Sequence, residues 1–278
     1  MRTTLLIAVL AISASVRAED SDVHVLLKNN DIGRADKLIG DVQRRFESGA
    51  LTEIELRNTF RPLYKLDAVA AKNLTDWAAN SPQSYSAHLA LGIYYKKVGL
   101  TIRGGKFISE TPKENIREMT RYLEKADNEL KKSLALTSKP YLSIFHLMEI
   151  SGTFGDRGYT KVLLSEANKI LPNNALARER YLIFLLPKWG GSYSEVDSFI
   201  SSNKKQGVPA NVILQLESIK YDDMGYALEA VGDHAGAQKY FEKALDLGAK
   251  AGGTFSVDFL SMSRYYMCRN PNAATYCR

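Results

Sequence analysis

YDDMGYALEAVGDHAGAQKYFEKALDLG, residues 221–248, carries the clearest structural signal in the chain. A Gly-Asp pair in its middle favours a turn between two helical segments. The second segment places Ala237, Phe241 and Ala244 on one face, in the order small, aromatic, small. Small residues let two helices approach closely, and the aromatic ring fills the gap to the next unit. The stretch therefore predicts a tightly packed helix pair.

This unit resembles the tetratricopeptide repeat, with Tyr221 at the large aromatic position and Gly225 at the glycine of the first helix. Weaker copies lie upstream. The small-residue position of the second helix recurs at Ala35, Ala70, Ala126, Thr160, Val196 and Ala237, with spacings of 35, 56, 34, 36 and 41 residues. Four of the five spacings lie near the ~34 residues of this repeat class.

The spacing is typical of repeated helix pairs, and the alternating apolar–polar runs of strands are absent. We therefore expect an all-α fold. We expect a right-handed solenoid of about six tetratricopeptide-like antiparallel helix pairs, ending in a closing helix at about 255–267. The remaining interpretation is a helical bundle whose spacing is accidental. The excess of 22 residues in the second spacing predicts an insertion at about 100–122. This insertion is either a tolerated surface loop with an extended helix or one side of a binding face.

A second departure from the repeat is the box Leu186-Pro187-Lys188-Trp189-Gly190-Gly191-Ser192. The proline ends its helix, the glycines permit a turn, and Ser192 can cap the helix that follows. One interpretation is a rigid corner in which Trp189 is buried, and the other is a binding site.

This box resembles that of a bacterial family of unknown function, together with Arg103-Gly104 and the segment at 49–53. The resemblance covers about residues 30–205, although that family usually has Arg where this chain has Lys188. It implies helical repeats and a bacterial envelope setting, and it implies no activity.

The N-terminus predicts a secretory signal peptide at 1–18. Arg2 precedes an apolar run from Leu5 to Ile12, and cleavage is expected after Ala18. The mature chain, 19–278, is then one soluble domain that is secreted across the inner membrane into the periplasm. No other stretch is long and apolar enough to span a membrane.

The chain has only two cysteines, Cys268 and Cys277, and in an exported protein these predict a disulfide that closes the tail. Two free thiols or a metal site are the alternatives, although two ligands are too few for a metal. The net charge is +6, from 37 basic and 31 acidic residues, and it falls to +4 after removal of Arg2 and Arg17. So mild a charge does not favour a nucleic-acid partner.

No motif for catalysis, a metal or a cofactor is present. The four histidines have no metal-ligand spacing, and no Gly-x-Ser-x-Gly sequence occurs. We therefore expect that the protein is not an enzyme and binds no cofactor. A catalytic site built from residues that are distant in sequence would leave no motif, so it stays an alternative.

The expected function is binding of a protein or peptide through the concave face of the solenoid. The partner-binding candidates are Leu89, Ile93, Lys96, Lys97, Arg103, Trp189, Asp222, Asp223, Tyr226 and Glu229. This face is expected to be basic near the insertion and acidic near the C-terminus. Two further hypotheses are an immunity or inhibitor protein against an envelope-delivered toxin and an assembly scaffold with the Trp189 corner as its oligomer contact.

Overall fold

The computed structural model describes residues 22–105 and 108–252, which contain helices and no strand. Three predictions lie outside the described residues: the signal peptide at 1–18, the closing helix at 255–267 and the Cys268–Cys277 disulfide. Within the described part, no helix is both long enough and apolar enough to cross a membrane.

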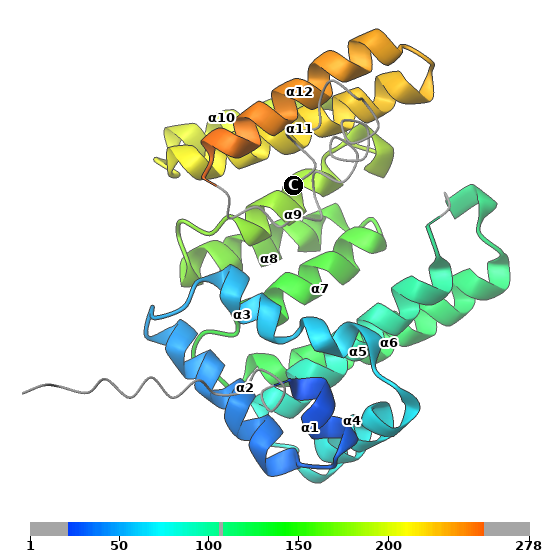
Figure 1. Cartoon of the computed structure of the whole chain (residues 1–278), viewed down its shortest axis with the longest axis vertical. Helices are drawn as coiled ribbons and strands as arrows, with labels where there is room; N and C mark the ends of the chain where they lie inside the picture. Colours follow the sequence, from blue (N-terminus) through cyan, green and yellow to red (C-terminus); the bar gives the residue numbers. More distant parts are fainter. Residues whose placement is uncertain (1–21, 106–107, 253–278) are drawn as a thin grey trace, which may run out of the picture.

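The first half of the chain is built from six α-helices and two short 3-10 helices (Figure 1). They are α1 (Val23–Lys28), α2 (Ile32–Glu47), α3 (Glu53–Thr59), η2 (Arg61–Lys65), α4 (Ala68–Asn80), α5 (Tyr85–Arg103), η3 (Ile108–Glu110) and α6 (Lys113–Leu134). Side-chain oxygens of Asp31, Thr52, Asp67 and Ser84 accept hydrogen bonds from backbone N–H groups in the first turns of α2, α3, α4 and α5. The helix starts are therefore set by local sequence.

The second half continues as α7 (Tyr141–Thr153), α8 (Arg157–Ile170), α9 (Leu176–Phe184), η4 (Pro187–Trp189), α10 (Tyr193–Lys205), α11 (Ala210–Ala230) and α12 (His234–Lys250). The pairs α5–α6, α7–α8 and α11–α12 each pack as neighbours in sequence. Figure 1 shows these elements following one another along the long axis of the molecule. The all-helical prediction is confirmed, with adjacent helices packed as pairs.

The six positions of the predicted small-residue series are all buried. Each of the six positions is at most 1% exposed: Ala35, Ala70, Ala126, Thr160, Val196 and Ala237. A Cβ added to Gly225 would lie 2.5 Å from the Phe241 ring, and one added to Gly92 would lie 2.6 Å from the Leu130 side chain. The same contact, a glycine of the first helix against a large residue of the second, therefore recurs in two units.

The packing departs from simple pairs in places. Helix α9 packs against α7, α8 and α11, whereas α4 packs against α1 and α5. The insertion is mostly helical, because it lengthens α5 to 19 residues and α6 to 22. Figure 1 shows the far end of α5 and α6 projecting beyond the neighbouring helices.

Candidate functional site

The Trp189 corner is a turn that only glycines allow. Gly190 has a positive φ of 80°, in the left-handed region. A Cβ on Gly191 would lie 2.0 Å from the carbonyl oxygen of Leu185, so no side chain fits there. The hydroxyl of Ser192 then caps α10 by accepting from the backbone N–H of Glu195, as the sequence predicted. The corner therefore holds Trp189 in a defined position after η4.

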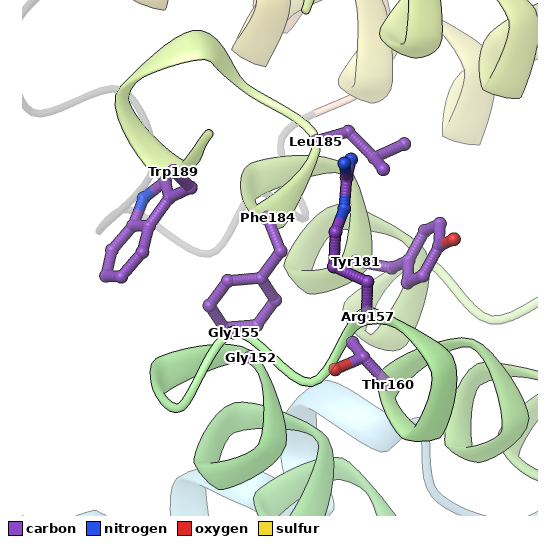
Figure 2. Close-up of a pocket in the computed structure, with 8 residues that line it drawn as sticks. All are labelled: Gly152, Gly155, Arg157, Thr160, Tyr181, Phe184, Leu185 and Trp189. Carbon is purple, nitrogen blue, oxygen red and sulfur yellow. The ribbon is translucent and has the colours of Figure 1, made fainter. Parts of the chain in front are cut away.

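The expectation that Trp189 is buried is wrong, because its side chain is 41% exposed. One edge of the indole meets the ring of Phe184 at a centroid distance of 5.4 Å and an interplanar angle of 81°. Phe184 in turn occupies the space that a side chain on Gly152 would fill, since a Cβ there would lie 2.3 Å from the ring. Figure 2 shows Phe184 above Gly152 and Gly155, with Trp189 beside it.

Trp189 faces a cleft of about 650 Å³. One side comes from the insertion and the far ends of α5 and α6, the floor from the turn between α7 and α8, and the other side from η4 and α11. The lining residues are Arg103, Gly105, Ile108, Ser109, Met119, Gly152, Thr153, Phe154, Gly155, Lys188, Trp189 and Tyr226. The volume is within the range of ligand-binding sites in proteins.

The cleft concentrates exposed apolar surface. Seven large hydrophobic side chains are exposed among the described residues, and three of them line this one cleft. These three are Ile108 (56% exposed), Phe154 (48%) and Trp189 (41%). Each comes from a different wall, so the apolar surface converges on the open cleft. Such clustering on the surface of a protein is typical of an interaction site.

The two charged side chains among the described lining residues, Lys188 and Arg103, are both basic. The ammonium of Lys188 lies 2.7 Å from a carboxylate oxygen of Asp223 and 5.5 Å from the centre of the Tyr226 ring. Asp223 is 4% exposed and also accepts a hydrogen bond of 3.1 Å from the hydroxyl of Tyr193. Arg103 contributes the second positive charge, and no acidic side chain is among the lining residues that the structure describes.

A smaller cavity of about 20 Å³ adjoins the cleft behind Trp189 (Figure 2). It shares Gly152, Gly155 and Trp189 with the cleft. At its other end the guanidinium of Arg157 forms an ion pair of 2.8 Å with Glu195. This space is enough for about one water molecule or methyl group, so it extends the cleft only slightly.

The structure corrects the basic half of the predicted face. Leu89 and Ile93 are fully buried and Lys96 is 4% exposed, because η2 and the neighbouring helices pack around α5. Lys97 is half-buried, with its ammonium 4.9 Å from the centre of the Tyr64 ring. These four positions of α5 therefore do not form an open surface.

The acidic half of that face is also largely enclosed. Asp222 and Asp223 are 6% and 4% exposed, and Glu229 lies 2.9 Å from His234 in an exposed ion pair. Tyr226 is the member of this group that lines the cleft. Of the ten candidates, the cleft thus brings together Arg103, Trp189 and Tyr226, while Phe154 and Ile108 were not predicted.

A buried ionic cluster joins the three helices α5, α7 and α9. The Lys96 ammonium on α5 contacts the Glu149 carboxylate and lies 2.7 Å from Nδ1 of His146, both on α7. Arg180 of α9 reaches the other Glu149 oxygen at 3.0 Å. These charges are partners for one another, as buried ions must be.

Burial is the largest single influence on the pKa values of His146, Lys96 and Glu149. It lowers the pKa of His146 to about 3, with a further contribution from the charge of Lys96, and it lowers the pKa of Lys96 to about 8. Burial opposes ionisation of Glu149 as well, but Arg180 and Lys96 hold its pKa well below the ordinary value. At neutral pH the native cluster therefore contains a neutral imidazole and an ionised carboxylate.

Nothing in the described part of the chain brings together three or more side chains able to hold a metal ion. No protein-family model matches this chain, and no curated protein matches it either. The two family resemblances drawn from sequence therefore stay predictions.

Proposed function

We propose that this chain is an exported, tetratricopeptide-like solenoid protein that binds a segment of another protein or peptide in the cleft beside Trp189. The observation that carries the proposal is the convergence of Ile108, Phe154 and Trp189 on one cleft. Interfaces gain most of their binding energy from a few aromatic or arginine anchors in a pocket. The cleft offers such anchors from separate walls.

The site also has the rigidity that recognition requires. Trp189 is held by Phe184, by the two glycines of its turn and by the Lys188–Asp223 ion pair. Ordering a flexible side chain on binding costs free energy, so an anchor already held in place binds more tightly. The contrast with the buried ionic cluster supports the choice of site, because the charged groups there already contact one another.

The test is affinity capture from an envelope extract with the tagged protein and with a Trp189→Ser/Phe154→Ser double variant. We expect one dominant partner to be retained by the parent protein and lost by the double variant. Val69→Ser is the matched control, because Val69 is a similarly exposed apolar side chain (54%) that belongs to α4 and not to the cleft.

Isothermal titration with the captured partner then gives the affinity of each variant. Loss of one anchor side chain should weaken binding by about thirtyfold and loss of both by up to about a thousandfold, since hot-spot truncations cost about 2 kcal/mol or more each. Equal affinity for the parent, the double variant and the control would remove the cleft from the proposal.

A further inference from the structure

The two sides of the cleft differ in chemistry. The insertion side carries Arg103, the last residue of α5, and the exposed Ile108. The facing side carries Trp189 and Tyr226, and Phe154 lies on the floor. A ligand that fills the space therefore meets a cationic group on one side and aromatic surface on the other.

Arg103 has N–H donors that remain available to a ligand. Its guanidinium donates a hydrogen bond of 3.1 Å to the carbonyl oxygen of Gly104 and forms no ion pair within residues 22–105 and 108–252. A guanidinium has five N–H donors, and a carboxylate can accept two of them side by side. Lys188 differs, because its charge is already compensated by Asp223. Among the described residues, the lining of the cleft therefore has a net positive charge and no acidic side chain.

We propose that the occupant of the cleft is an acidic peptide segment, in which carboxylate side chains flank an apolar one. The inference rests on the proposed function and specifies its partner. A carboxylate of the segment pairs with Arg103, and the neighbouring apolar side chain packs between Trp189 and Phe154. Charge complementarity of this kind selects among partners and speeds their association.

The chain carries its own reporter for this site. It has two tryptophans, of which Trp77 is 3% exposed and Trp189 is 41% exposed. In a Trp77→Phe variant all indole fluorescence comes from the cleft. If that variant does not fold, acrylamide quenching of the parent protein selects Trp189 instead, because a buried indole is shielded from the quencher.

The probes are three capped peptides: Glu-Glu-Leu-Phe-Glu-Glu and its counterparts with Gln or with Lys in place of every Glu. We expect the Glu peptide to shield Trp189 from acrylamide and to bind about tenfold more tightly than the Gln peptide, as one charge-assisted contact implies. Arg103→Gln should remove this preference. Arg44→Gln on α2, an exposed arginine paired with Asp41, should leave it unchanged.

Several outcomes would overturn the inference. Equal binding of the Glu and Gln peptides, tighter binding of the Lys peptide, or no binding of any peptide would each exclude an acidic segment. Shielding of Trp189 that rises with protein concentration alone would identify a second copy as the occupant. The proposed function fails separately, when the Trp189→Ser/Phe154→Ser variant retains its captured partner.

Discussion

Replacing Glu179 with Gln should stabilise the protein, by an amount that grows with pH. The Glu179 carboxyl is 1% exposed, and neither of its oxygens has a hydrogen-bond partner among the described residues. Burial raises its pKa from 4.5 to about 8, and the charge of Glu53 contributes in the same direction. At neutral pH the folded protein therefore keeps a proton on Glu179 that the unfolded chain has released.

The sign and the size follow from this difference in bound protons. Because the folded state binds the additional proton between pH 4.5 and about 8, the free energy of unfolding decreases as the pH rises through that window. Each pH unit corresponds to about 1.4 kcal/mol, which gives about 3 kcal/mol between pH 4.5 and pH 7. Gln has the same shape and does not ionise, so Glu179→Gln removes this loss.

The assay is urea unfolding followed by circular dichroism, for both proteins at pH 5, 6, 7 and 8. The two free energies should be similar at pH 5 and should separate steadily toward pH 8, with the variant more stable. Glu166→Gln, at an exposed carboxylate of α8, is the matched control and should show no such separation. A difference between parent and Glu179→Gln that is the same at every pH would refute the reasoning.

Three further predictions concern the corner, the helices and the ionic cluster. Gly191→Ala should lower the free energy of unfolding by about 1–3 kcal/mol in urea titrations, because its Cβ would press on the backbone of Leu185. Gly33→Ala on α2, where nothing lies within 4 Å of the new Cβ, should raise it by about 0.5–1 kcal/mol. Because burial lowers the pKa of His146 to about 3, the folded state binds fewer protons than the unfolded chain between pH 6.5 and 3. His146 therefore contributes a loss of stability as the pH drops through this window, opposite in sign to the contribution of Glu179. In a urea series at pH 6.5, 6 and 5, the free energy of unfolding of His146→Gln should rise relative to that of the parent protein as the pH falls.

The helical fold and the pairing of adjacent helices could be predicted because both depend largely on local sequence. Four of the five spacings in the small-residue series lie near ~34 residues, and all six of its positions are buried. The capping role of Ser192 was predictable for the same reason, since a cap involves only neighbouring residues.

The exposed face could not be predicted, because it depends on contacts between distant segments. Leu89 and Ile93 would face outward in an open row of helix pairs, but η2 packs against α5. Lys96 and His146 form a contact across 50 residues of sequence, which no periodicity indicates. Phe154 follows the end of α7 in a turn, and no pattern in the sequence separates an exposed aromatic residue there from a buried one.

The length of the α5–α6 tip, which forms one wall of the cleft, can change without disturbing the packing of the two helices. The contact between Gly92 and Leu130 that holds α5 against α6 lies well before the tip that carries Arg103 and Ile108. Lengthening or shortening the tip by matched helical turns would leave that contact in place and change only what stands across from Trp189. Natural variants of this hairpin could therefore exchange one partner for another without refolding the protein, and the same segment offers protein engineers a place to graft a new recognition loop.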